Sequence, residues 1–310
     1  MIAMNKTQLT MFELAGLTND KNLIPFLFLF FLAVYVITIM GNVGMMVIIQ
    51  VFSSLHTPMY YFLNYLSLVD LLYSSTITPK ILVDLISSKK SISFIGCAFQ
   101  VYFYAALAGV EVVLLSSMAY DRYAAICHPL RYALIMTKPK CTGLVLLSFA
   151  VGFFQSAAQT SCLFSLEYCG SNFIEHFYCE IPPVLKLSCS VLVVFVLYLL
   201  VVVVVVVLYL LILLFVSYTL IISAILQMKS TKGRQKAFST CSSHLMCATI
   251  FYVTVFVTYL HPSSSHLEKQ NKVASVFYAV VTPMLNPLIY SLRNQEVKRV
   301  ILQLLQKHKH

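Results

Sequence analysis

Seven stretches of mostly apolar residues, each about as long as a membrane-spanning helix, divide the chain. They are 23–49, 58–80, 97–121, 141–161, 191–227, 237–260 and 272–292. A helix needs about 20 apolar residues to cross a bilayer, whereas a barrel strand needs only about 10. The stretches therefore predict an all-α membrane protein, a bundle of seven transmembrane helices. Only 10% of the residues are charged, against about 25% in a soluble domain, which excludes a soluble fold.

Lys and Arg in the short loops determine the orientation of such a bundle. With the N-terminus outside, the inner face holds 13 of the 21 basic residues, opposed only by Asp121 and Glu296. The N-glycosylation acceptor Asn5-Lys6-Thr7 agrees with this orientation, because glycans are added on the lumenal side. The excess of positive charge thus marks a membrane face and does not indicate a nucleic-acid partner.

Three regions follow from this reading. Residues 1–22 form an extracellular N-terminus, 23–292 form the seven-transmembrane domain, and 293–310 form a cytoplasmic segment. Within that segment, apolar residues recur at helical spacing between 294 and 307. This pattern predicts a short amphipathic eighth helix that lies on the inner membrane surface.

Several sequence segments carry a family resemblance. In chain order they are Gly41-Asn42, LHTPMYYFL (55–63), LSLVD (66–70), MAYDRYAAICHPLRY (118–132), Ser217-Tyr218, KAFSTCSSHL (236–245) and PMLNPLIYSLRN (283–294). Together they resemble the rhodopsin-like G-protein-coupled receptors and, more narrowly, the odorant (olfactory) receptors.

The resemblance implies a function without catalysis. Such a receptor binds a small volatile hydrophobic odorant within the helix bundle. It then activates a heterotrimeric G protein of the stimulatory olfactory type and raises cyclic AMP. It is a multi-pass protein of the plasma membrane, in the cilia of olfactory sensory neurons. No enzyme activity and no cofactor are expected, apart from an allosteric sodium ion.

The resemblance also assigns switch residues. In this assignment, Arg122 at the inner end of the third helix pairs with Asp121 at rest and is released toward the G protein. The alternative interpretation is that Arg122 is an ordinary arginine at the membrane interface, in a surface ion pair. Asn286-Pro287 costs a helical hydrogen bond and predicts a kink, which the family uses as an activation hinge. The full set of coupling and switch residues is Asp121, Arg122, Tyr123, Tyr218, Asn286, Pro287 and Tyr290.

Two carboxylates, Asp70 and Glu111, lie inside predicted membrane helices. Counted from the inner ends of their helices, both lie about 17–18 Å deep. Two negative charges at one depth disfavour each other, so the pair should share a proton or hold a cation. The resemblance makes that cation sodium, with Asn286 and Ser116 or Ser117 as helpers. The alternative is a protonated pair that serves packing alone.

Four cysteines belong to the outer face and allow three pairings. The family pattern selects Cys97–Cys179 and Cys169–Cys189 as disulfides. His176, Cys179 and Glu180 could together bind copper or zinc, but a disulfide would consume the softest ligand, so loop packing is the default interpretation.

The family's ligand pocket lies between the third, fifth, sixth and seventh helices. The matching positions are Tyr104, Ala105, Ala108, Gly109, Val202, Val206, Tyr252, Tyr259, Val276 and Ala279. They suggest an apolar wall with phenolic donors, suited to a hydrophobic ligand that carries one acceptor. Ordinary helix packing explains each position equally well, since Ala and Gly also permit close helix approach.

One segment departs from the family pattern. Cys189-Ser190 leads directly into an uninterrupted apolar run, Val191–Val216, where family members usually have polar residues. Three alternatives to an odorant receptor stay open, and this run is the reason for the second of them. They are a rhodopsin-like receptor for a non-odorant ligand, a poorly trafficked non-signalling remnant, and a transporter or proton channel that uses the two buried acids.

Overall fold

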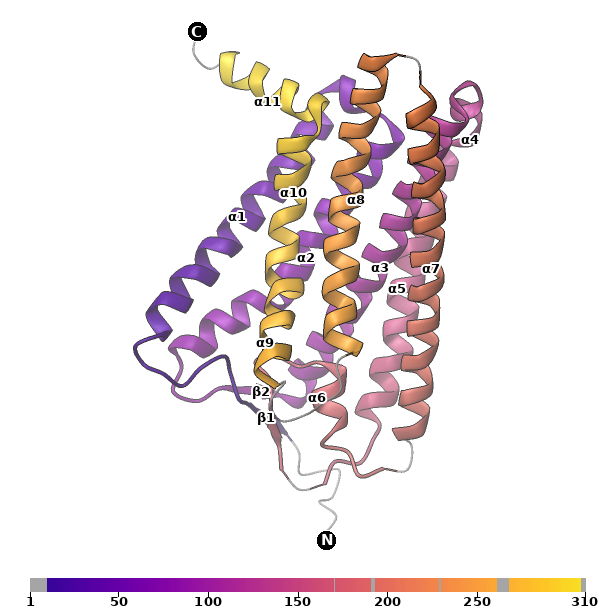
Figure 1. Cartoon of the computed structure of the whole chain (residues 1–310). Helices are drawn as coiled ribbons and strands as arrows, with labels where there is room; N and C mark the ends of the chain where they lie inside the picture. The colour runs from indigo at the N-terminus through magenta and orange to yellow at the C-terminus, as the bar shows by residue number, and fades with distance from the viewer. Residues whose placement is uncertain (1–9, 170, 191–192, 229, 261–267, 308–310) are drawn as a thin grey trace.

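The chain folds into a bundle of long helices in the computed structural model (Figure 1). The structure describes residues 10–169, 171–190, 193–228, 230–260 and 268–307. The long helices are α1 (Ile24–Val51), α2 (Pro58–Ile86), α3 (Phe94–Cys127), α5 (Lys138–Phe164), α7 (Val193–Gln227) and α8 (Thr231–Leu260). A last helical column consists of α9 (Glu268–Val276), the π-helical turn η3 (Phe277–Val281) and α10 (Thr282–Arg293).

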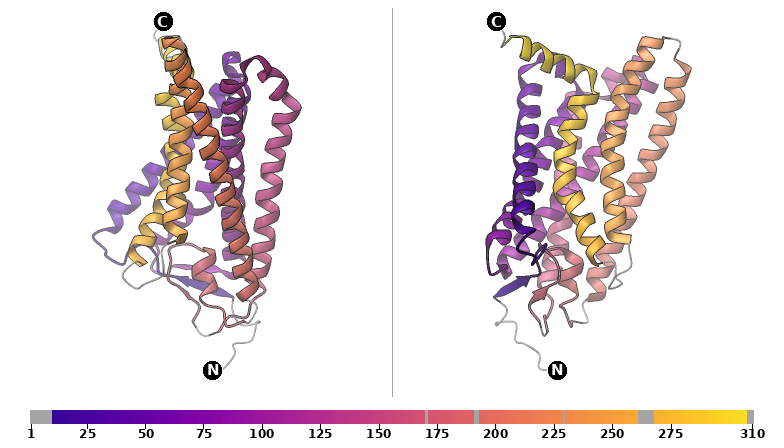
Figure 2. Two further views of the ribbon diagram at one scale, coloured as in Figure 1. Left: turned by 45° about the vertical axis from the view of Figure 1, so that its right-hand side comes forward. Right: turned by 60° about the vertical axis from the view of Figure 1, so that its left-hand side comes forward.

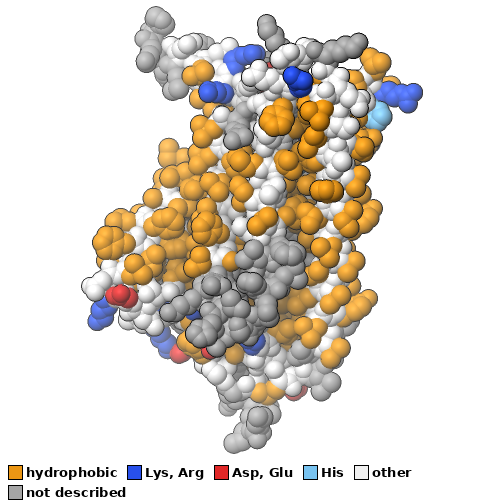
Figure 3. Space-filling view, viewed as in Figure 1, with side chains coloured by type: hydrophobic (Ala, Val, Ile, Leu, Met, Phe, Trp, Pro, Cys, Tyr) orange, Lys and Arg blue, Asp and Glu red, His pale blue; other side chains and the backbone are white. Residues whose placement is uncertain are grey.

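Each predicted apolar stretch falls on one of these helical columns. Six of the helices among the described residues are long and apolar enough to cross a membrane. The stretch 237–260 lies in α8, which stands beside the other helices along the bundle (Figure 1). Apolar side chains cover the middle of the visible face, and Lys and Arg lie toward its two ends (Figure 3). This distribution matches a belt that contacts lipid.

Short elements connect the columns. They are η1 (Ser53–Leu55), η2 (Pro129–Arg131), α4 (Tyr132–Ile135) and α6 (Ile181–Leu185). The helix α11 (Gln295–Lys307) follows α10 and turns away from the bundle axis (Figure 2). We call the end of the bundle that carries α11 the C-terminal end.

A small sheet, which no sequence pattern predicted, closes the opposite end. Its strands are β1 (Met11–Leu14), β2 (Ser91–Ser93) and β3 (Phe173–Ile174), in the order β2-β1-β3. Strand β1 pairs antiparallel with β2 and parallel with β3. The segment before α1 is thereby tied to the loops that precede α3 and α7. We call this end the sheet end.

The valine-rich run forms a regular helix despite its β-branched residues, because a lipid-exposed backbone has to satisfy its hydrogen bonds internally. Most of its described side chains face outward in α7, and Val196 and Leu214 are buried. The long run therefore supplies lipid-facing surface along most of its length.

Helices α3 and α5 approach each other through glycines. A Cβ built on Gly152 of α5 would lie 2.5 Å from the carbonyl oxygen of Ala106 in α3. A Cβ on Gly109 of α3 would lie 3.1 Å from the Cα of Gly152. The two backbones thus touch at a point where no side chain fits between them, as in other small-residue contacts of membrane helices.

Candidate functional site

Two prolines of the last helical column interrupt its hydrogen-bond ladder. Pro287 has no N–H, so the carbonyl of Pro283 loses its helical partner. The side chain of Asn42 in α1 replaces that partner, since its Nδ2 donates to the Pro283 oxygen at 3.0 Å. Gly41 makes room for the proline ring, because a Cβ there would lie 3.0 Å from Cγ of Pro287. The motif Gly41-Asn42 therefore supports the interrupted turn from the neighbouring helix.

Pro283 interrupts the same ladder one turn earlier, next to η3. It offers no N–H to the carbonyl of Ala279, and the backbone widens into a π-turn just before it. The carbonyl of Phe277 accepts the backbone N–H of Thr282 across the widened turn, and Thr282 Oγ1 donates to the same oxygen at 3.2 Å. Both irregular segments of the column thus have an identifiable cause in the sequence.

Asp70, Glu111 and Asn286 come together in the middle of the bundle. Asn286 Nδ2 lies 3.0 Å from Oδ2 and 3.2 Å from Oδ1 of Asp70, and 3.5 Å from Oε1 of Glu111. The three side chains come from α2, α3 and α10 and are almost completely buried. One amide therefore bridges the two carboxylates. Counting residues along their helices had predicted that both lie at the same depth.

The two serines that were expected to help this site bond to their own helix. Ser116 Oγ donates to the carbonyl of Val112, and Ser117 Oγ to that of Val113, each at 2.9 Å. Their hydroxyl oxygens still have lone pairs that accept or ligate. The oxygen donors of this site are hard ligands, the kind that a small cation prefers.

Asp121 and Arg122 form an ion pair at the C-terminal end of α3. Nε of Arg122 donates to Oδ2 of Asp121 at 2.9 Å, and a second guanidinium nitrogen contacts the same oxygen. Tyr132 of α4 donates to the other carboxylate oxygen at 2.7 Å. The carboxylate is fully buried, so the arginine is held by its sequence neighbour in this conformation.

Other members of the predicted switch set make contacts outside this ion pair. Tyr123 hydrogen-bonds with His128 at 3.2 Å. Tyr218 of α7 hydrogen-bonds with Nδ1 of His244 in α8, and Nε2 of His244 contacts the carbonyl of Leu115 at 3.1 Å. Tyr290 is fully buried in α10. His244 and Tyr132 were not predicted as site residues, although both lie in the segments that carry the family resemblance.

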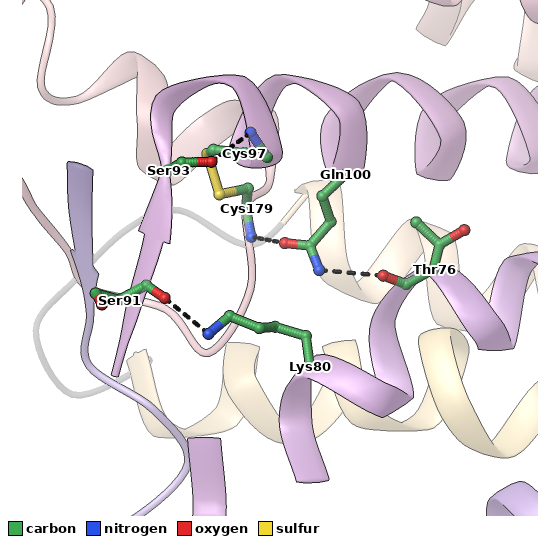
Figure 4. Close-up of a disulfide and its surroundings, with 8 residues drawn as sticks. Thr76, Lys80, Ser91, Ser93, Cys97, Gln100 and Cys179 are labelled. Carbon is green, nitrogen blue, oxygen red and sulfur yellow. Dashed lines mark hydrogen bonds between the residues drawn. A yellow bond between two sulfur atoms is a disulfide. The ribbon is translucent and has the colours of Figure 1, made fainter. Parts of the chain in front are cut away.

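Both expected disulfides are present at the sheet end, Cys97–Cys179 and Cys169–Cys189. Gln100, one turn after Cys97, reinforces the first of them (Figure 4). Its Oε1 accepts from the backbone N–H of Cys179 at 2.9 Å, and its Nε2 donates to the carbonyl of Thr76 in α2 at 3.2 Å. The loop before α7 is therefore fixed to α3 covalently and to α2 through one amide.

Glu180 follows Cys179 and points into a cluster of phenols. Its Oε1 accepts from Tyr104 at 3.3 Å and from Tyr278 at 3.0 Å, and its Oε2 accepts from Tyr178 at 3.1 Å. The hydroxyls of Tyr178 and Tyr278 lie 2.9 Å apart. All four side chains are buried. We call these four residues the Glu180 cluster, which joins the loop, α3 and η3.

His176 covers the cluster from the sheet end. Its ring stacks on Phe177 and meets Tyr178 edge-on, and its Nε2 lies 3.9 Å from Oε2 of Glu180. Burial, followed by the positive charge of Lys272, lowers the pKa of His176 to about 3. With Cys179 in a disulfide, His176 and Glu180 serve loop packing, and the described residues offer no group of three metal-binding side chains.

The proposed pocket positions divide into four groups. Tyr104, Tyr252 and Ala279 are buried inside the bundle, and Ala105, Ala108 and Val276 are half-buried. The side chain of Tyr259 and the glycosylation acceptor Asn5 lie outside the described residues.

Three pocket assignments were wrong. Gly109 faces Gly152 of α5 and serves helix packing. Val202 and Val206 are 40% and 46% exposed on the outward face of α7. The sequence misassigned them because an uninterrupted apolar run has no periodicity to distinguish an inner from an outer face.

Comparisons with known proteins agree with this arrangement. The family model described as "Olfactory receptor" matches residues 31–308. Mouse olfactory receptor 5AP2 is 49% identical over 304 residues, covering 98% of this chain and 96% of the relative. Human olfactory receptor 5F1 is 48% identical over 303 residues, again covering 98% and 96%.

The solved structure of squid rhodopsin has a similar fold. It superposes with a TM-score of 0.68 at 14% sequence identity and covers 89% of this chain and 78% of its own. Family members are multi-pass receptors of the plasma membrane, which pair a small-molecule ligand with a G protein, and they are not enzymes. With near full-length relatives and the receptor fold both present, the chain belongs to the olfactory receptor family.

Proposed function

We propose that the protein binds a small volatile hydrophobic odorant inside the helix bundle and activates a stimulatory heterotrimeric G protein of the olfactory type, which raises cyclic AMP. The observation that carries this proposal is the Arg122 ion pair with Asp121, held further by Tyr132. A buried carboxylate that holds a partly buried guanidinium defines a resting state, and release of the arginine defines a second one. An odorant that favours the second state shifts the equilibrium toward it.

The surface around Arg122 supports a partner at the C-terminal end. Leu130 is 98% exposed and Leu134 is 80% exposed on the short segments η2 and α4 that follow α3. Two exposed leucines beside a buried ion pair are the kind of apolar anchors that protein interfaces bury. The basic residues of this end complement an acidic partner or the anionic face of a membrane.

The proposed orientation places the sheet end outside the cell. Both disulfides lie at that end, and disulfides persist in oxidising compartments. In the sequence, the glycosylation acceptor Asn5 precedes β1, a strand of that end. In this orientation α11 becomes the cytoplasmic eighth helix, and the cilia of olfactory sensory neurons are the proposed location. The boundaries 1–22, 23–292 and 293–310 describe the corresponding regions.

We further propose a sodium ion between Asp70 and Glu111. The two carboxylates supply hard oxygen ligands at the buried layer, and Asn286 orients them. A cation bound there would offset the repulsion between the two acids and favour the conformation in which all three side chains converge.

The receptor proposal is tested in cells that express the chain with an N-terminal tag. Surface display and cyclic AMP are measured together across a broad odorant panel, with Arg122→Ala as the signalling-dead control. We expect a dose-dependent rise in cyclic AMP that Arg122→Ala abolishes while its surface display is unchanged.

Other outcomes favour the alternatives. Good display without any response would favour a non-odorant ligand, and intracellular retention would favour the non-signalling remnant. A response that Arg122→Ala leaves intact would contradict the switch.

A further inference from the structure

A small cavity at the sheet end joins three segments that are distant in the sequence. Gly16 and Leu17, which follow β1, line one side of it, and Asp84 lines it from the last turn of α2. Lys90, just before β2, and Phe177 of the loop before α7 also line it. The cavity measures about 10 Å³, which is about the size that holds one water molecule. With a carboxylate and an ammonium in its wall, the site is polar as well as small.

Asp84 has one carboxylate oxygen left for a hydrogen bond. The residue is 4% exposed, and Lys80, one turn earlier, donates to its Oδ1. Lys80 also donates to the carbonyl of Ser91 at 2.8 Å (Figure 4). Oδ2 of Asp84 is buried and accepts from no donor of the described chain. Because a buried acceptor without a donor is costly, this oxygen requires a donor that comes from outside the chain.

Lys90 has the complementary requirement. Its Nζ donates to the carbonyl of Thr18 and to Oδ1 of Asn19, each at 2.8 Å. An ammonium group carries three protons, so one proton remains after these two bonds. A Cβ on Gly16, which has a φ of +70°, would lie 2.9 Å from Nζ of Lys90. The glycine therefore leaves room for the ammonium beside the cavity.

The two requirements together specify the occupant of the cavity. It has to donate a proton to Asp84 and accept one from Lys90, within the volume of a single water molecule. A metal cation accepts no proton, and it would add positive charge where Lys80 and Lys90 already surround one carboxylate. An anion donates no proton to the carboxylate. A water molecule meets both requirements, since buried waters make two to four hydrogen bonds to polar groups around them.

We infer that the cavity binds one water molecule, which accepts from Lys90 and donates to Asp84, and that this bridge fastens the N-terminal segment to α2. Lys90 holds the segment directly, and the water connects Lys90 to the helix. Phe177 lines the same cavity and directly precedes Tyr178 of the Glu180 cluster. The bridge therefore also supports the loop that carries this cluster.

The direct test is an experimental structure of the purified full-length receptor at a resolution that shows ordered water. We expect one density peak at about 2.7–3.2 Å from both Asp84 Oδ2 and Lys90 Nζ. A peak with several oxygens at about 2.3–2.6 Å would be a cation such as Ca²⁺. That result, a cavity without a peak, or Lys90 turned directly onto Asp84 would each overturn the inference.

Hydrogen exchange of the backbone amides in residues 15–20 tests whether the bridge fastens this segment. Asp84→Asn keeps an acceptor for Lys80 but presents N–H protons to the cavity, so the water loses the acceptor for its own proton. A hydrogen bond to a charged group is worth about 10- to 100-fold in an equilibrium constant. We therefore expect exchange to accelerate by about that factor. Glu13→Gln, which changes an exposed acid of the same segment, should leave the exchange rate as it is.

A matched pair of lysine variants separates the bridge from the direct bonds of Lys90. Lys90→Gln should accelerate exchange at least as much as Asp84→Asn does, whereas Lys89→Gln, at the exposed neighbouring position, should have no effect. If Lys90→Gln accelerates exchange and Asp84→Asn behaves like Glu13→Gln, Lys90 holds the segment alone and the bridge is refuted. None of these measurements needs an odorant, so their outcome is independent of the proposed function.

Discussion

The contact between α3 and α5 predicts a large difference between two chemically identical substitutions on one helix. In Gly152→Ala the new methyl group would lie 2.5 Å from the carbonyl oxygen of Ala106 and 2.8 Å from the backbone nitrogen of Val110. Ordinary contact begins at 3.4 Å, and neither obstacle is a side chain that could rotate away. The helices therefore have to separate by about 1 Å, an overpacking that costs about 1–3 kcal/mol.

Gly143→Ala is the matched control. Gly143 belongs to the same helix, and a Cβ at this position would have no atom within 4 Å. The exchange should be neutral or stabilising by up to about 1 kcal/mol, because Ala is the better helix former. Gly109→Ala should fall between the two, since its Cβ would be 3.1 Å from Gly152.

Thermal unfolding of the purified receptor in detergent measures the order, and surface display gives a second readout. We expect the midpoint to fall in the order Gly143→Ala, Gly109→Ala, Gly152→Ala. If Gly152→Ala unfolds at the same temperature as Gly143→Ala, the two helices are not in backbone contact and the reasoning is refuted.

Three further predictions use the same unfolding assay. Asn42→Ala leaves the Pro283 carbonyl buried without its partner and should cost about 1–3 kcal/mol, whereas an unchanged midpoint would mean that another donor replaces the amide. Sodium chloride should raise the midpoint more than choline chloride does, and Asp70→Asn should abolish that difference; a difference that survives the substitution would exclude this site. Because the pKa of His176 is lowered to about 3 from its usual 6.5, the unfolded state binds a proton that the folded state does not. Stability should therefore fall as the pH drops below about 6.5, by at most about 1.4 kcal/mol per unit, and His176→Gln should remove this dependence.

Much of the fold followed from local properties of the sequence. Length and hydrophobicity alone predict membrane helices, because a bilayer imposes both on any helix that spans it. Short segments such as 118–132 and 283–294 indicated the family and with it the switch residues. The convergence of Asp70 and Glu111 could be anticipated by counting residues from the helix ends, because the helical rise is constant.

The parts that depend on contacts between distant segments could not be predicted in this way. Strand β1 is four residues long and gains its partners from loops about 80 and 160 residues away, so it leaves almost no local signal. From the sequence alone, the glycines at positions 109 and 152 are equally compatible with a pocket and with a helix contact. The rotation of α3 about its axis decides between the two. Likewise, the valines of α7 give no indication of which side faces lipid.

The sequence by itself determined that this chain is a helical membrane receptor of the olfactory receptor family, because hydrophobic length and family motifs are properties of the chain read in order. The tertiary structure decided how the loop before α7 meets the helices. The hydrogen bonds of Tyr104, Tyr178 and Tyr278 with Glu180 join three separate segments. Whether a phenol offers a proton or a lone pair depends on the acceptor that the fold places beside it.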